Sequence, residues 1–227
     1  MWIDPSDTAT ITESAGLVSQ INDKSGNGYH LTQATGASQP TTGTRTINGY
    51  NVLDFDGSSD KFDINSALYS LPTGGDFTVL QVINLDAYDA TSNAAGLWIG
   101  DGAGKSLHTS RISSAGVEAG LHVDTGGVLT ASSKTGVAFS TGQTRIVGCQ
   151  IASSQIKAIT DTERGPLAAI SSFTGTTGSV SVAASIYNYL NGMFGEFLIY
   201  NRALTTSEIN QVGGYLANKY GITWTDI

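Results

Sequence analysis

Residues 191–223 read NGMFGEFLIYNRALTTSEINQVGGYLANKYGIT, a segment in which a strand pattern is followed directly by a helix pattern. Its first part, residues 193–200, is apolar at nearly every position, which predicts a strand covered on both faces. Thr205 followed by Glu208 has the spacing of a capping box, in which each side chain bonds a free backbone N–H at a helix start. We therefore predict a buried strand followed by a closing helix over about residues 206–220.

The predicted helix has one apolar face. Ile209, Val212 and Leu216 follow the helical period and predict a stripe that packs against the rest of the protein. Gly213–Gly214 allows that contact to be close, and Gly221 suits the left-handed backbone that ends many helices. A buried strand joined to a docked helix closes a fold and by itself contains no chemistry.

The whole chain favours one all-β domain over residues 1–227. Its 227 residues include 28 Gly, and only 13% are charged, which suits many turns between short strands. Residues 77–85 (FTVLQVINL) are apolar on both faces and predict a central strand of a two-layer structure. Similar short runs separated by Gly-rich turns follow, and helical periodicity is almost absent before residue 205. We predict a two-sheet antiparallel sandwich or jelly roll with one C-terminal helix.

Two further local predictions concern the first third of the chain. Residues 34–48 are rich in Thr, Gly and Ser and have little to bury, so we predict a surface loop there. Residues 50–55 and 61–64 are strand-like on either side of the turn DGSSD, which predicts a hairpin.

Composition also excludes several partners. The net charge of -8 repels phosphate backbones, and no basic run counters it, so nucleic acid is not expected as a partner. Cys149 is the single cysteine; it lies in an apolar strand pattern and is expected to be buried. The sequence shows neither a signal peptide at its start nor a run of about 18 apolar residues, so no membrane insertion is expected.

Several motifs resemble, in order, the concanavalin A-like or laminin-G-like jelly rolls often found in virion proteins of tailed phages. The resemblance covers nearly the whole chain, although residues 86–140 match only in pattern. It implies two curved antiparallel sheets of the lectin and glucanase fold, and does not define one activity, since that fold includes lectins, glycan-binding modules, glucanases and structural parts. The matching residues are Trp2 with 4–7 (DPSD), 23–28 (DKSGNG), Gln33, Pro40, 53–58 (LDFDGS), 77–79 (FTV), Gly192, 196–204 (EFLIYNRAL) and Glu208.

No arrangement of catalytic residues is evident, so we predict that the chain is not an enzyme. Glucanases of this fold resemble E-x-D-x-x-E on one strand, where alternation points the first and last carboxylates into a cleft. No Glu of this chain belongs to that pattern, and residues 161–163 (DTE) are better interpreted as a turn. No G-x-S-x-G elbow positions a serine nucleophile. Glu196 is alone on an apolar strand, so we expect Arg202 or backbone N–H groups to compensate its charge.

Two oxygen-rich turns are candidates for calcium, which takes six to eight oxygen ligands. The alternative is that their Asp and Asn side chains cap turn backbones, and no other cofactor is expected. The three His residues lack zinc-ligand spacing. The candidate calcium ligands are Asp23 and Asn27 in the first turn and Asp54, Asp56 and Asp60 in the second.

Carbohydrate binding requires an exposed aromatic platform beside amides or carboxylates, because a pyranose has apolar faces and a polar edge. Trp98 beside Asp101 is one candidate. Tyr187 and Tyr189, which alternation places on the same strand face, form the other. The alternative is that these aromatic side chains belong to the core.

Two functions are therefore predicted. The first is a non-catalytic structural or interaction protein of a phage particle, either a head decoration or a tail-associated accessory protein with glycan-binding capacity. It would be assembled in the host cytoplasm and lie on the virion surface, as a homo-oligomer or docked on a symmetric shell of other virion proteins. The alternative is a carbohydrate-binding module or lectin, with or without calcium, that attaches to host-surface glycans.

Overall fold

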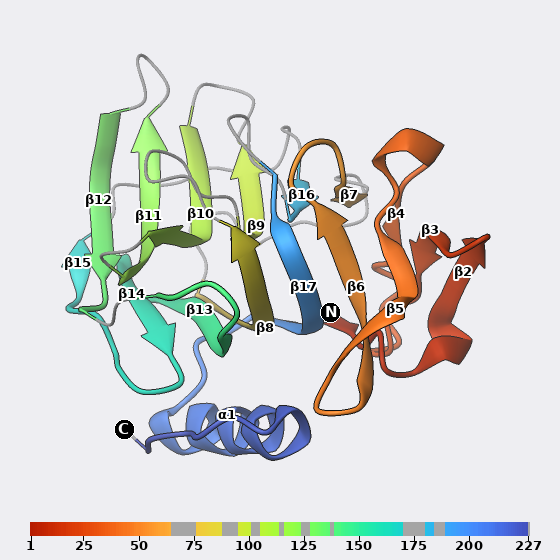
Figure 1. Ribbon diagram of the computed structural model, residues 1–227. Helices are drawn as coiled ribbons and strands as arrows, with labels where there is room; N and C mark the ends of the chain where they lie inside the picture. Colours follow the sequence, from red (N-terminus) through yellow and green to blue (C-terminus); the bar gives the residue numbers. More distant parts are fainter. Residues whose placement is uncertain are drawn as a thin grey trace.

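The computed structural model of the chain describes residues 1–64, 76–87, 95–100, 105–113, 116–123, 128–136, 139–169, 180–183 and 189–226. Within them lie 17 strands, two short 3-10 helices (Thr8–Thr10 and Gly36–Ser38) and one α-helix, α1 (Thr206–Tyr220) (Figure 1). The strands are β1 (Trp2–Ile3), β2 (Ile11–Ser14), β3 (Leu17–Ile21), β4 (Leu31–Thr32), β5 (Thr41–Ile47), β6 (Tyr50–Asp56), β7 (Phe62–Ile64), β8 (Phe77–Ala87), β9 (Ala95–Gly100), β10 (Lys105–Ser113), β11 (Gly116–Val123), β12 (Val128–Lys134), β13 (Thr144–Ala152), β14 (Gln155–Thr160), β15 (Ala168–Ala169), β16 (Val180–Val182) and β17 (Asn191–Tyr200).

The strands pair antiparallel and form two layers. One layer has the order β5–β6–β17–β8–β13–β14–β15, with β1 beside the end of β17. The other has the order β4–β7–β16–β9–β10–β11–β12. β3 pairs with β2, β4 and β5 and so joins the layers at one edge. The predicted all-β sandwich with a C-terminal helix is confirmed, whereas the assignment of residues 1–227 to one domain stays a prediction.

β8 is the central strand of its layer, as its two apolar faces predicted. It lies between β17 and β13, where Val79 is opposite Ile199 on one side and Cys149 on the other. Val79 and Ile83 belong to the core between the layers. Cys149 is also buried there, as expected, and burial raises the pKa of its thiol. β8 therefore fixes the spacing of the inner core and presents its other face to α1.

α1 covers the outer face of this layer (Figure 1). Ile209 and Leu216 are buried, and Val212 is half-buried, in a second hydrophobic cluster. The sheet contributes Leu80 and Val82 of β8 to the same cluster, together with residues of β13, β14 and β17. The predicted apolar stripe of the helix is therefore confirmed, and the helix shields the outer face of β8 from solvent.

Both ends of α1 have the predicted chemistry. The Thr205 side chain accepts from the Glu208 backbone N–H, and the Glu208 carboxylate accepts from the Thr205 N–H, which completes the capping box. Gly221 is left-handed with φ 70° and donates its N–H to the Ala217 carbonyl. Gly213 packs against the C-terminal tail, since a Cβ there would lie 2.3 Å from the Trp224 ring.

Two local predictions are wrong, both because strand pairing overrides local composition. Residues 41–47, predicted as part of a loop, form β5, whose Thr-rich sequence is extended by pairing with β6. The predicted hairpin between residues 50–55 and 61–64 does not form, because β6 pairs with β5 and β17 whereas β7 pairs with β4 and β16. The turn between them carries the chain from one layer to the other.

Candidate functional site

An open groove with a volume of about 710 Å³ crosses the outer face of the sandwich beside the C-terminal end of α1. It lies where β5, β8 and β14 end and where β13 and β17 begin. We call it the helix-end groove. Asn84 and Met193 lie among its lining residues, together with residues 46–48, 143–145, 161–162 and 220–223.

The β5–β6 turn and the C-terminal tail hold the walls of the groove in place. Asn48 in the turn donates its side-chain N–H to the Lys219 carbonyl over 2.9 Å, which satisfies one of the free carbonyls at the end of α1. Beyond Gly221, the tail turns back, and the Thr225 N–H donates to the Asp161 carbonyl over 2.8 Å. The groove is thus lined by six separate chain segments that meet only in the folded protein.

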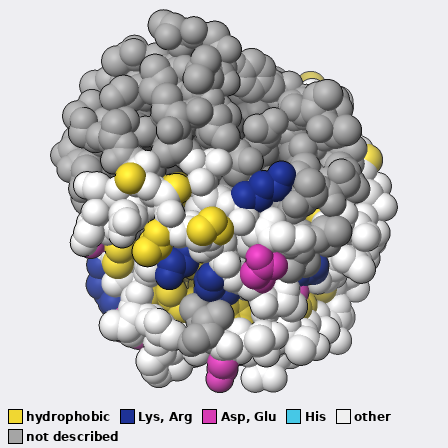
Figure 2. Space-filling model, turned by 90° about the vertical axis from the view of Figure 1, so that its left-hand side faces the viewer, with side chains coloured by type: hydrophobic (Ala, Val, Ile, Leu, Met, Phe, Trp, Pro, Cys, Tyr) yellow, Lys and Arg dark blue, Asp and Glu magenta, His cyan; other side chains and the backbone are white. Residues whose placement is uncertain are grey.

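Basic and hydrophobic side chains gather on the face that carries this tail (Figure 2). The Arg164 guanidinium stacks 4.8 Å from the Trp224 ring centroid and donates to the Thr160 carbonyl over 2.7 Å. Burial lowers the pKa of Arg164 to about 10. Trp224 therefore lies between Gly213 of the helix and Arg164, which follows β14. These contacts hold in place the C-terminal tail, which forms one wall of the groove.

Two buried polar atoms of groove-lining residues have unmet hydrogen-bonding capacity. Asn84 donates from its side-chain nitrogen to the Gly142 carbonyl and the Thr144 hydroxyl, over 3.1 and 3.0 Å. Its Oδ1 and the Tyr220 hydroxyl have no hydrogen-bond partner within the part of the chain that the structure describes. Burial, followed by the negative charge of Glu196, raises the pKa of Tyr220, so this hydroxyl is neutral. Buried groups of this kind normally find a partner.

A closely held ion pair forms one wall of the groove. Arg145 donates from Nε to both carboxylate oxygens of Asp161, each over 2.8 Å, and its Nη2 lies 2.7 Å from Oδ1. The two side chains are only 11% and 5% exposed. Burial raises the pKa of Asp161, against the opposing effect of the Arg145 hydrogen bonds. The wall is polar and its two charges neutralise each other.

The remaining polar groups of the groove are hydroxyls and amides, from Thr46, Gln143, Thr144 and Thr162. Such groups both donate and accept hydrogen bonds. A lining that combines them with a few apolar side chains suits a polyhydroxylated ligand, whose hydroxyl groups also do both. The arrangement contains no pair of free carboxylates placed for acid–base work within the described residues that line it.

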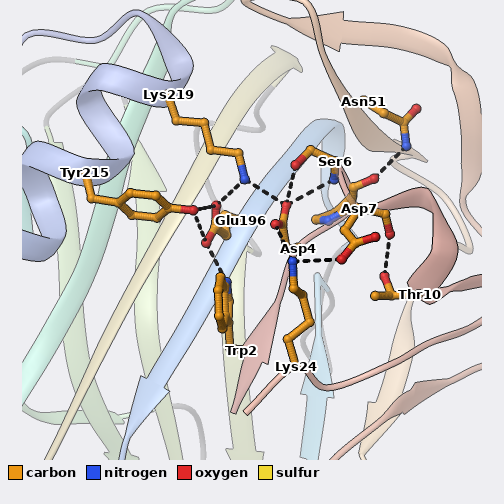
Figure 3. A network of polar contacts seen from close by, with 11 residues as sticks. Trp2, Asp4, Ser6, Asp7, Thr10, Lys24, Asn51, Glu196, Tyr215 and Lys219 are labelled. Atoms are coloured by element: carbon orange, nitrogen blue, oxygen red, sulfur yellow. Dashed lines mark hydrogen bonds and ion pairs between the residues drawn. The ribbon is translucent and has the colours of Figure 1, made fainter.

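Glu196, the lone carboxylate of β17, lies in a buried polar network between α1 and the N-terminal segment (Figure 3). It is 0% exposed. It accepts from the Trp2 indole N–H over 2.5 Å, from the Tyr215 hydroxyl over 3.0 Å and from Lys219 Nζ over 2.7 Å. Burial, with Glu196 next, raises the pKa of Tyr215 to about 12. All its partners are structural, so Glu196 fastens the helix to the sheet.

Asp4 extends this network to a second cation. Lys219 lies 2.9 Å from Asp4 Oδ1, and Lys24 lies 3.1 Å from Asp4 Oδ2. Although burial raises it, hydrogen bonds from Ser6, Lys219 and Lys24 hold the pKa of Asp4 below its ordinary value. The expectation that Arg202 compensates Glu196 is wrong, because Arg202 turns outward and pairs with Glu208 over 2.7 Å. Lys219, one helical turn after Tyr215, lies on the inward face instead.

The candidate calcium ligands mostly accept hydrogen bonds from their own turns. Asp23 accepts from the backbone N–H groups of Trp2, Ser25 and Tyr29, and Asn27 bonds Ser25. Within the described residues, no group of three or more His, Cys, Asp or Glu side chains is arranged to hold a metal ion. Calcium binding by these turns stays a prediction.

The second turn has the same character. Asp56 accepts from the N–H groups of Ser58, Ser59 and Asp60, and these bonds outweigh burial and lower its pKa. Asp54 pairs with Arg45 over 2.9 Å.

Asp60 gives the stability a pH dependence. Burial raises its pKa to about 6, together with the charges of Asp56 and Asp54 and against the hydrogen bond from the Asp56 N–H. Because this is above the unfolded value of about 3.9, the native state binds the proton more tightly, and the contribution of Asp60 to stability falls as pH rises from about 4 to about 6. Asp60→Asn should therefore stabilise the protein at pH 7 by about 1–3 kcal/mol and flatten that fall, as measured by urea unfolding across this pH range. Asp63→Asn, at a side chain 48% exposed, is the control; an unflattened fall in Asp60→Asn contradicts the prediction.

None of the predicted carbohydrate contacts is among the described groove-lining residues. Asp101 and Tyr187 lie outside the described residues. Trp98 belongs to β9, where it is opposite His108 and Ser181. Tyr189 is 37% exposed just before β17 and is not among the described groove-lining residues. These four residues stay predictions, and the groove was missed because its residues carry no common sequence motif.

No protein-family model and no curated protein sequence matches the chain. Solved structures do. Domain 4 of AbnA, a GH43 extracellular arabinanase from Geobacillus stearothermophilus, in complex with arabinotriose, has a TM-score of 0.63 at 11% identity, covering 93% of this chain and 96% of that one. The CBM40 of the Ruminococcus gnavus IT-sialidase, bound to α2,3 sialyllactose, has a TM-score of 0.55 at 15% identity, covering 71% and 95%.

Trypanosoma rangeli sialidase in complex with sialic acid has a TM-score of 0.56 at 12% identity, covering 96% of this chain but only 32% of that enzyme. At such identities the likeness shows the fold alone. The chain is a β-sandwich of the class found in carbohydrate-binding and glycosidase-related proteins. In the part that the structure describes, no helix has the length and apolarity needed to cross a membrane.

Proposed function

We propose that this chain is a non-catalytic carbohydrate-binding domain that holds a glycan in the helix-end groove. The observation that carries the proposal is the groove itself, an open space of about 710 Å³ lined by hydroxyls and amides. The proposal is supported by structural neighbours whose complexes contain arabinotriose and α2,3 sialyllactose.

A glycan array tests the proposal. We expect the purified protein to bind at least one class of oligosaccharide, and a parallel array with a calcium chelator decides whether calcium takes part. Absence of binding in both arrays would contradict the proposed function.

A groove-filling substitution then tests the location. Thr46 is exposed on β5 and lines the groove, so Thr46→Trp should weaken binding of the array-selected glycan by about tenfold or more in calorimetric titration. Thr12→Trp, at an exposed strand residue outside the groove lining, is the matched control and should bind as the unmodified protein does. Equal binding by the two variants would show that the glycan binds outside the groove.

The phage role predicted from sequence stands as a second candidate function. The resemblance of residues 196–204 to the jelly rolls of tailed-phage virion proteins supports it. A glycan-binding domain on a virion surface, as a homo-oligomer or on a symmetric shell, combines both functions in one protein. The partner proteins and the virion location stay predictions.

A further inference from the structure

The charges of the groove limit which glycans it can take. Arg145 and Asp161 are the charged residues among the described groove lining. They are paired through three contacts of 2.7–2.8 Å and are nearly buried. The groove therefore offers neither a free cation nor a free carboxylate to a ligand.

An acidic sugar carries a carboxylate, which requires a cationic partner that the Arg145–Asp161 pair does not leave free. A guanidinium recognises a carboxylate through two parallel N–H donors on one edge. Arg145 has two such edges. Asp161 occupies the edge formed by Nε and Nη2, and Nη2, which also belongs to the second edge, donates to the Thr162 hydroxyl over 3.3 Å. A sialic or uronic acid could use the first edge only by displacing Asp161, which would leave a buried carboxylate without its partner. The net charge of -8 adds a general repulsion of anions.

A neutral sugar requires only hydrogen-bond donors and acceptors, and the groove provides both. Its hydroxyls can exchange hydrogen bonds with the Thr46 hydroxyl and the Gln143 amide, which line the groove. The Thr144 and Thr162 hydroxyls already accept bonds from Asn84 and Arg145. Their orientation is therefore fixed before a ligand arrives, which reduces the entropy lost on binding.

Resting on the proposed glycan binding, we propose that the helix-end groove selects neutral saccharides and excludes those that carry a carboxylate. The Arg145–Asp161 pair is the selective element, since it presents a polar surface to hydroxyls while Asp161 and Thr162 already engage the two guanidinium edges that an acidic sugar could use. The groove therefore discriminates in two ways: it forms hydrogen bonds with neutral sugars, and it lacks a free cation for acidic ones.

The test uses an array of neutral oligosaccharides beside the same oligosaccharides capped with sialic acid or oxidised to uronates. Calorimetric titration of the best-bound matched pair should give binding at least about tenfold tighter for the neutral member. Equal or tighter binding of the acidic member overturns the selectivity while leaving the proposed function intact. No binding of either member overturns the proposed function itself.

Two variants test the mechanism. Asp161→Asn removes the negative charge that neutralises Arg145, and we expect the preference for the neutral member to fall by about tenfold or to reverse. Thr223→Lys adds an unpaired cation at an exposed groove residue without touching the ion pair, and should shift the preference in the same direction. Circular dichroism confirms that each variant is folded. An unchanged preference in folded Asp161→Asn contradicts the role given to the pair, and an unchanged preference in folded Thr223→Lys contradicts selection by the charges of the groove.

Discussion

Lys219→Met should lower the free energy of unfolding by about 3–5 kcal/mol, because it removes the cation from a buried charge network. Lys219 lies 2.7 Å from the fully buried Glu196 and 2.9 Å from Asp4, and is itself 11% exposed. Without it, two carboxylates face each other with too little compensation. Urea unfolding at pH 7 measures the loss.

The matched control is Arg202→Met, which removes a cation of the same helix region from an exposed ion pair with Glu208. Exposed pairs contribute little, so this variant should unfold at nearly the unmodified urea concentration. The double variant Glu196→Gln with Lys219→Met should recover part of the lost stability, because the buried charge is removed together with its partner. Equal losses in the two methionine variants would show that the network does not fasten the helix.

A chain that ends after residue 201 should lose its cooperative thermal transition, or show a midpoint at least about 10 °C lower. The truncation removes α1 and the tail, and so uncovers the outer-face cluster to which Leu80 and Val82 belong. Burying one such side chain is worth about 1.5–3 kcal/mol, and the whole native state is typically stable by only about 5–15 kcal/mol.

Two substitutions within α1 refine this test without shortening the chain. Leu216→Ala, at a side chain 0% exposed, should cost about 2–5 kcal/mol, whereas Gln211→Ala on the exposed face should change little. Circular dichroism melts measure all three chains. An unchanged midpoint in the truncated chain would show that the helix does not close the outer face.

What the sequence predicts correctly is mostly encoded over short distances. The capping box of Thr205 and Glu208 and the left-handed Gly221 depend on neighbours within a few residues, and all have the predicted roles. The two apolar faces of residues 77–85 likewise follow from alternation alone, and β8 is central as predicted.

The errors arise where distant pairing decides the structure. Residues 41–47 have weak strand chemistry of their own and are extended by β6, and residues 61–64 pair in the opposite layer from residues 50–55. Glu196 has partners near both chain ends, namely Trp2, Tyr215 and Lys219, so spacing along β17 could not reveal them.

The groove residues could not be predicted from local sequence patterns for the same reason. Asn84, Arg145 and Tyr220 are far apart in the sequence and become groove residues only through the sheet order and the return of the tail. The Asp residues that did stand out in the sequence are mostly occupied in capping turns or in ion pairs. The groove is instead lined by ordinary Thr, Asn and Tyr residues, which converge in space but have no recognisable pattern in the sequence.

A two-dimensional amide NMR titration with the array-selected oligosaccharide shows residue by residue whether a glycan binds in the helix-end groove. We expect the largest shift changes at groove residues, among them Asn84, Thr144 and Gly221, and expect them to saturate with the calorimetric affinity. Saturable changes centred on Trp98 or Tyr189, with the groove amides unmoved, would contradict this expectation and return the site to the aromatic residues predicted from sequence.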